Sequence, residues 1–103
     1  MTAASQPQEI LRAKINLETS QIAWKELLRF FASGTVIAVS PELDLVDVAI
    51  HISEDRKEQV EQWLSANKLG KVSDDQARTW LESDAMVWSV VVRPWILVQQ
   101  RTN

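Results

Sequence analysis

The chain has 103 residues, of which 46% are hydrophobic and 24% charged, and its 11 basic and 14 acidic side chains give a formal net charge of −3. This length predicts one globular domain over residues 1–103, because two separate units would each be too small to bury a core. Residues 1–6 are small and polar and are expected to form a flexible tail, and residues 101–103 a frayed end.

Several functional classes are excluded by composition. The longest apolar run, 90–98, is interrupted by Arg93 and Pro94, so it is too short for a membrane-spanning helix of about 20 residues. The first residues lack the pattern of a secretory signal, and we therefore expect a cytoplasmic location. With no Cys and one His, neither a metal site nor a cofactor is predicted. The two Gly cannot form a phosphate-binding loop, and the basic side chains are scattered among acidic ones, which argues against nucleic acid. Nucleic-acid binding is the least favoured hypothesis and would depend on Lys68 and Lys71 near Gly70.

The first expected element is a helix that begins near Ser5. Ser5 is suited to cap its start, and Pro7 is tolerated in a first turn. This helix would carry Ile10, Leu11 and Ile15 on its apolar side.

A second, stronger helix is predicted over Ser20–Ser33, followed by Gly34. Its apolar residues are spaced at i, i+3, i+4 and i+7, which is the spacing of one helical face. These residues are Trp24, Leu27, Leu28 and Phe31.

A β-hairpin is expected next. Thr35–Val39 is rich in β-branched residues, and the Ser and Pro of segment 40–43 suit a type I turn. Asp44–Ile52 then alternates in hydrophobicity, which predicts a strand with one buried face and one mixed face that carries Asp47 and His51.

Two further helices are each introduced by a serine and two acidic residues, at Ser53 and Ser73. A serine oxygen can accept a hydrogen bond from an early N–H, and the carboxylates favour the positive end of a helix. Gly70 is expected to mark the turn between them. Their buried residues would be Val60, Trp63 and Leu64 in the first, and Ala77, Trp80 and Leu81 in the second.

The segment from Met86 to Gln100 is rich in Val and is predicted to be a long strand, bent or bulged at Pro94. A tight hairpin at Arg93–Pro94 is the less favoured alternative, because Pro is disfavoured at the second central position of a turn unless its bond is cis. The expected fold is α+β, in the order α-α-β-β-α-α-β, with three to four helices on a small, mostly antiparallel sheet.

Few residues suggest chemistry. His51 is the one side chain suited to proton transfer near neutral pH, but in an extended strand it would lie about 13 Å from Asp47. A ligand site formed by His51, Asp47 and Arg93 is the alternative that this mixed face allows. Glu42, Asp44 and Asp47 could offer oxygen ligands to Mg²⁺ or Ca²⁺, but their spacing does not match a calcium loop, so no metal site is predicted.

The five Trp residues are the most informative feature, because tryptophan is frequent both in cores and at interfaces. Three of them lie on predicted helix stripes and are expected in the core: Trp24, Trp63 and Trp80. Trp88 and Trp95 are expected on opposite faces of the last strand. With Arg93 they are the candidate interaction residues.

Three segments together resemble a known family. They are ETSQIAWKELLRFFASG at 18–34, LDLVDVA at 43–49 and VVVRPWILVQ at 90–99. Over residues 11–100 the chain resembles a family of small uncharacterised bacterial proteins, domain of unknown function 2288. The resemblance implies a bacterial cytoplasmic protein and carries over no catalytic or binding residues.

The sequence thus favours a non-enzymatic protein-interaction module, including self-association as a homodimer, through the Arg93 and Trp95 face or the unpaired edge of the predicted hairpin. The alternative is a small-molecule-binding protein or enzyme that uses the mixed sheet face around His51. Neither hypothesis requires a membrane or a nucleic acid.

Overall fold

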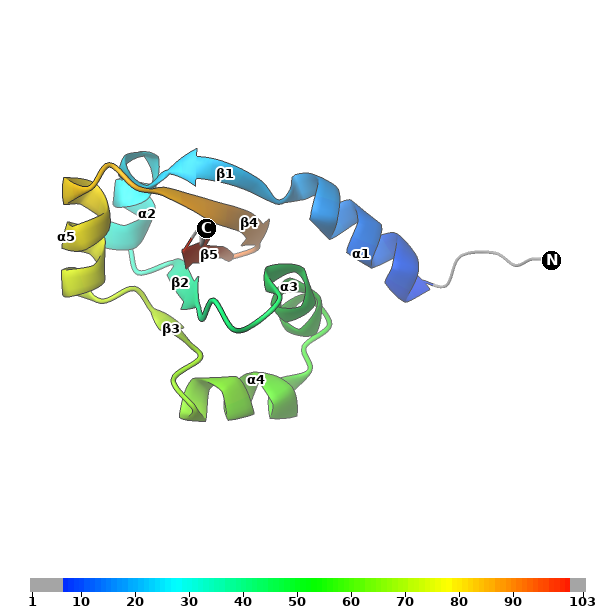
Figure 1. Ribbon diagram of the computed structural model, residues 1–103. Coiled ribbons are helices and arrows are strands. Elements are labelled where there is room, and N and C mark those ends of the chain that lie inside the picture. The colour runs from blue at the N-terminus through cyan, green and yellow to red at the C-terminus, as the bar shows by residue number, and fades with distance from the viewer. Residues whose placement is uncertain (1–6, 101–103) are drawn as a thin grey trace.

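The computed structural model describes residues 7–100, and Figure 1 shows the arrangement of its elements. The expectations for residues 1–6 and 101–103 lie outside the described residues. The helices are α1 (Pro7–Glu18), α2 (Leu28–Ala32), α3 (Leu45–Ser53), α4 (Lys57–Ser65), α5 (Asp74–Glu82) and a short 3₁₀-helix, η1 (Trp24–Leu27). The strands are β1 (Ser20–Ala23), β2 (Val36–Val39), β3 (Leu69–Lys71), β4 (Met86–Val92) and β5 (Trp95–Gln100).

The strands form one mixed sheet in the order β1-β4-β5-β2-β3. Neighbouring strands are antiparallel except β2 and β5, which are parallel. The predicted α+β class is confirmed, and most pairings are antiparallel as expected. The predicted order of elements is wrong in four places, which are described below.

Each face of the sheet supports its own hydrophobic cluster. The α3 cluster lies between the sheet and α1, α3 and α4, and the α5 cluster lies between the opposite face and η1, α2 and α5 (Figure 1). The α3 cluster contains Ile15, Val39, Leu45, Val46, Val48, Ala49, Ile50, Leu69, Val90, Val92 and Leu97. The α5 cluster contains Trp24, Leu27, Val36, Val72, Ala77, Trp80, Val87, Ile96 and Val98.

The predicted first helix is confirmed as α1. Ile15 is buried and Leu11 packs against the α3 cluster, whereas Ile10 is exposed. Ser5, the expected cap, lies outside the described residues. In Figure 1 α1 extends away from one end of the sheet.

The helix predicted over Ser20–Ser33 is correct only in its second part. Ser20–Ala23 forms β1 and pairs with β4, and the helical conformation starts at Trp24 as η1 and continues in α2. The backbone N–H of Trp24 donates to the carbonyl of Ala85 at 2.9 Å. Pairing with a distant strand therefore overrides the local helical pattern at residues 20–23.

The strand predicted over Thr35–Val39 is confirmed as β2, and so is the turn after it, in which the N–H of Leu43 donates to the carbonyl of Ser40 at 3.0 Å. The second strand of the predicted hairpin, Asp44–Ile52, is wrong, because this segment is α3.

Asp44 is the cap of α3. Its Oδ1 accepts hydrogen bonds from the backbone N–H of Val46 at 2.9 Å and of Asp47 at 3.4 Å. Apolar residues in this segment match the spacing of two residues and also the helical spacing, so alternation alone could not distinguish a buried helix from a strand.

The cap predicted at Ser73 is confirmed, since its Oγ accepts a hydrogen bond from the N–H of Gln76 at 3.1 Å. The start predicted at Ser53 is wrong. Ser53 is the last residue of α3, where its Oγ donates to the carbonyl of Ile50 at 3.1 Å. Helix α4 begins later, after Asp55 in the left-handed conformation (φ 57°).

Gly70 was expected in a turn but lies in β3. The turn that precedes it is made by Asn67, which has a φ of 60°. Asparagine adopts the left-handed conformation more readily than most residues, so it takes the place expected for the glycine.

The C-terminal segment is a hairpin of β4 and β5 in which Val92 pairs with Trp95. The bent single strand is therefore wrong, and the less favoured alternative is correct. The Arg93–Pro94 bond is cis, the conformation that lets Pro occupy this turn position. Paired residues lie on the same face of a sheet, and so do residues four apart on one strand. Val92 pairs with Trp95 and lies four residues after Trp88, so Trp88 and Trp95 share one face. The prediction of opposite faces is wrong.

Candidate functional site

Within the described residues 7–100, the outer edge of β1 is unpaired, because β1 is the first strand in the sheet order. In an antiparallel ladder, residues that hydrogen-bond to the neighbouring strand alternate with residues that do not. The hydrogen bond from the Trp24 N–H to the Ala85 carbonyl shows which residues of β1 bond to β4. From this alternation, the N–H and C=O groups of Ile22 point toward β4, whereas those of Gln21 and Ala23 point outward. The edge therefore offers two backbone donors and two acceptors.

An apolar surface lies beside this edge. Trp88 pairs with Gln21 and Met86 pairs with Ala23, so these four side chains share one face of the sheet. Trp88 is 37% exposed and Met86 is 42% exposed. We call the outer edge of β1 together with Trp88 and Met86 the β1 surface.

The other two expected interaction residues lie at the turn end of the hairpin. Arg93 is exposed in the turn, and no ion pair holds it among residues 7–100. Trp95 is half-buried and packs against the α3 cluster. Trp88 is therefore more exposed than Trp95, and of the three residues it is the one that lies beside an unpaired strand edge.

His51 and Asp47 are brought together, contrary to the separation expected for a strand. They lie one helical turn apart on α3, where Nδ1 of His51 is 2.8 Å from the backbone carbonyl of Asp47 and 3.9 Å from its Oδ1. Because a carbonyl can only accept, Nδ1 carries the proton and donates. The ring also packs edge-to-face on Trp63 of α4, with ring centroids 5.1 Å apart. These contacts give His51 a packing role at the α3–α4 contact.

The three carboxylates considered for a metal ion are each in contact with other groups of the protein. Asp44 caps α3 and Asp47 accepts a hydrogen bond from Arg12 Nη2 at 3.0 Å. Glu42 Oε1 lies 3.4 Å from Lys68 Nζ. Within the described part of the chain, no group of three or more His, Cys, Asp or Glu side chains could hold a metal ion.

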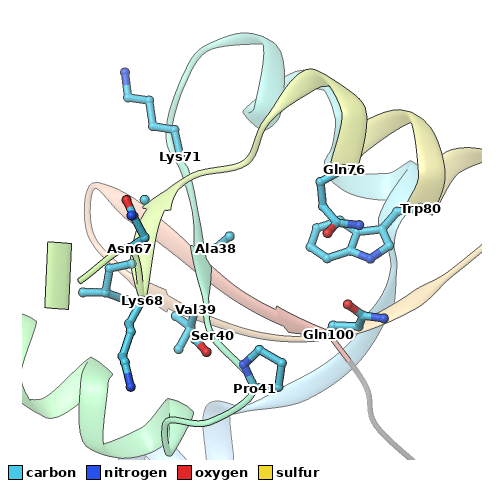
Figure 2. A pocket seen from close by; sticks show the side chains of 12 residues that line it. Ala38, Val39, Ser40, Pro41, Asn67, Lys68, Lys71, Gln76, Trp80 and Gln100 are labelled. Atoms are coloured by element: carbon cyan, nitrogen blue, oxygen red, sulfur yellow. The ribbon is translucent and has the colours of Figure 1, made fainter. Parts of the chain in front are cut away.

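A cavity of about 320 Å³ lies between the β2–β3 edge of the sheet and α5 (Figure 2). Ala38 and Gly70, which are paired in the β2–β3 ladder, form its floor. Gln76 and Trp80 of α5 and Gln100 of β5 form the opposite wall (Figure 2).

Sequence reasoning missed the residues of this cavity and most of the β1 surface. Trp80 was expected only as a core residue, and Gly70 only as a turn residue. No short motif marks either site, because each combines single residues from elements distant in the sequence. The one available signal was the neutral segment Ser20–Ala23, which contains no proline or charge to protect a strand edge.

Comparison with family models gives a match to the protein of unknown function (DUF2288) over residues 10–100. The chain belongs to this family. The resemblance expected from the sequence is therefore confirmed. Because the function of the family is unknown, membership in the family assigns no activity to the DUF2288 chain. Comparison with curated proteins gave no match.

Among solved structures, the chain is similar to the NMR solution structure of PA1075 from Pseudomonas aeruginosa, with a TM-score of 0.80 and 41% sequence identity. The match covers 100% of this chain and 95% of that chain. The two proteins thus have a similar fold. In the DUF2288 chain, no helix within residues 7–100 is long and apolar enough to cross a membrane.

Proposed function

We propose that this protein is a non-enzymatic interaction module that associates with a second copy of itself through the β1 surface. The observation that carries the proposal is the unpaired, uncharged edge of β1 with Trp88 and Met86 exposed beside it. Unpaired edges of this kind are a template for strand pairing. A cytoplasmic location is part of the proposal.

The pattern of backbone groups supports pairing of two identical strands. In an antiparallel arrangement centred on Ile22, Gln21 of one copy would face Ala23 of the other, and the outward groups of both residues would form four interchain hydrogen bonds. The arrangement is a closed two-fold dimer. Because β1 carries no charge, the pairing brings no like charges together within the strand.

The apolar side chains support the same partner. Across the two-fold axis, Trp88 and Met86 of one copy would lie on the same sheet face as those of the second copy. Leu17 of α1, which is 86% exposed, precedes β1 by three residues and is a further exposed apolar side chain close to this strand in the sequence. Burial of exposed aromatic and aliphatic groups is the main stabilising contribution at such interfaces.

The opposite edge of the sheet is a poorer candidate. Strand β3 has three residues, and its end carries the exposed Lys71. Short strands and edge lysines oppose strand pairing. Of the two sheet edges, we therefore assign self-association to that of β1.

Arg93 and Trp95 remain a proposed secondary contact at the turn end of the hairpin. The alternative function, a ligand site or enzyme around His51, Asp47 and Arg93, is less well supported. The Nδ1 of His51 is already bound to its own helix, and its ring packs on Trp63.

Solution mass measured by sedimentation equilibrium across a range of concentrations tests the proposal. We expect the mass to rise from the monomer value of 11.7 kDa toward that of a dimer. Gln21→Pro removes an outward N–H without removing a β1–β4 bond, and we expect it to remain monomeric. Trp88→Ser should weaken association, whereas Leu64→Ser, an exposed apolar position on α4, should not.

A monomer mass for the natural chain up to about 1 mM, where even weak association is detectable, would overturn the proposal. So would a Gln21→Pro variant that associates as strongly as the natural chain. Trp88→Ser retains the strand edge, so its result separates the contribution of the side chain from that of the backbone.

A further inference from the structure

We propose that the cavity between β3 and α5 binds a small organic anion with a flat, partly apolar body. This site is separate from the β1 surface, which lies at the opposite edge of the sheet. Its volume of about 320 Å³ lies at the lower end of the range for small-molecule sites, about 300–1,000 Å³.

The floor of the cavity is open because its two residues are small. Ala38 and Gly70 lie side by side on the face that carries the α5 cluster. A Cβ added at Gly70 would meet no atom within 4 Å. The absence of a side chain at Gly70 therefore leaves space above the sheet that a flat ligand can occupy.

The wall opposite the floor carries hydrogen-bonding groups. Trp80 is 5% exposed, and its Nε1 is a buried donor that has no hydrogen-bond partner within residues 7–100. A buried N–H that lacks an acceptor is unfavourable, so a ligand acceptor would stabilise it. Figure 2 shows the indole nitrogen on the side of the ring nearer to Gln100. Gln100 is exposed. We propose that its side chain moves aside when a ligand binds, so that the ligand reaches the indole nitrogen.

The polar side chains around the indole are suited to a ligand with both donors and acceptors. Gln76 and Gln100 lie beside Trp80 (Figure 2), and each carboxamide can donate and accept. The indole itself provides a flat apolar surface against which a ring can pack.

The charge of the lining favours an anion. The protein has a net charge of −3, yet among residues 7–100 the charged residues that line the cavity are Lys68 and Lys71, and no carboxylate of this range lines it. Both ammonium groups point away from the cavity centre in Figure 2. Because Lys side chains are long and flexible, either ammonium can turn toward a bound anion at the rim.

Titration of the ¹⁵N-labelled protein with benzoate, followed by NMR, tests the proposal. We expect saturable shifts of the Gly70 amide and the Trp80 indole N–H signals, with a Kd of about 1 mM for a ligand of this size. Benzamide has the same shape without the charge and should bind at least about threefold more weakly, because the lysine contribution is lost. Acetate has the charge without the ring and should shift neither signal.

Two variants locate the site. Gly70→Leu places an apolar side chain in the open space and should abolish the benzoate shifts, whereas Ala66→Leu, at an exposed position after α4, should leave them unchanged. Trp80→Phe keeps an aromatic ring and removes the N–H, and we expect about a threefold loss of affinity. The spectrum of each variant also reports whether it folds.

The proposal is overturned if benzoate causes no saturable shift of these two signals up to about 10 mM, a concentration well above the expected Kd. It is also overturned if benzamide binds equally well or if a folded Gly70→Leu variant retains binding. If Gly70→Leu does not fold, undiminished affinity of the folded Trp80→Phe variant overturns it. Each of these results is independent of the oligomeric state.

Discussion

Arg12 of α1 donates a hydrogen bond from Nη2 to Oδ1 of Asp47 on α3, over a distance of 3.0 Å. The same guanidinium lies 3.7 Å from Oδ2 of Asp44, the residue that caps α3. Together with the burial of Ile15, this contact determines how the projecting helix α1 is attached to the rest of the molecule. Asp44 and Asp47, two of the carboxylates considered for a metal ion, thus form a structural network with Arg12.

Replacement of Arg12 by Ala is expected to lower the free energy of unfolding by about 0.2–1 kcal/mol, because both partners are partly exposed and solvent screens the pair. The loss should decrease at high salt. Urea unfolding at two salt concentrations measures it. Arg78→Ala, which removes an exposed pair with Asp75 within α5, provides the control and should change stability less.

Replacement of Asp44 by Ala removes the cap of α3 and should cost about 1 kcal/mol of stability. Asp44→Asn retains a cap oxygen and should lose only the weaker, charge-dependent contact with Arg12. The difference between the two variants in urea unfolding measures the cap. Equal losses would show that the cap contributes nothing.

Val90 and Val91 provide a test of which face of β4 is buried. Val90 is 1% exposed and Val91 is 57% exposed, although they are adjacent. Val90→Thr buries a hydroxyl and should lower the free energy of unfolding by about 1–3 kcal/mol. Val91→Thr should change it by less than about 0.5 kcal/mol. Thermal or urea unfolding of both variants checks the assignment, and a reversed order would contradict the register of β4.

Elements whose limits depend on local chemistry could be predicted from the sequence. The Ser73 cap of α5, the β-branched strand β2 and the turn at Ser40 are of this kind, and all three are confirmed. The α+β class followed from the same elements. Each of these features depends on residues within a few positions of one another.

The errors have a common physical cause, which is contact with distant parts of the chain. Residues of β1 follow a helical pattern but pair with β4, more than sixty positions later in the chain. Helix α3 is apolar on several sides because it is covered by α1, α4 and the sheet, so its pattern did not show one buried face. The sequence contains no local sign of either environment.

The candidate sites were predictable only in part. Trp88 was expected as an interaction residue from its residue type, but its position beside an unpaired edge depends on the strand order. The cavity could not be predicted, because Gly70, Trp80 and Gln100 meet only after β3, α5 and β5 have assembled. Gln99 shows the same effect: its Nε2 donates to the carbonyls of Ser40 and Leu43, at 2.9 and 2.6 Å, and so fixes the loop before α3.

The central position of β5 has a consequence for how the molecule reaches its native state. β5 joins β4, which carries β1, to β2, which carries β3. A chain that ends before Trp95 contains four of the five strands but lacks the strand that hydrogen-bonds to both halves of the sheet. Ordered tertiary structure should therefore appear in a single concerted step, after the last strand has become available.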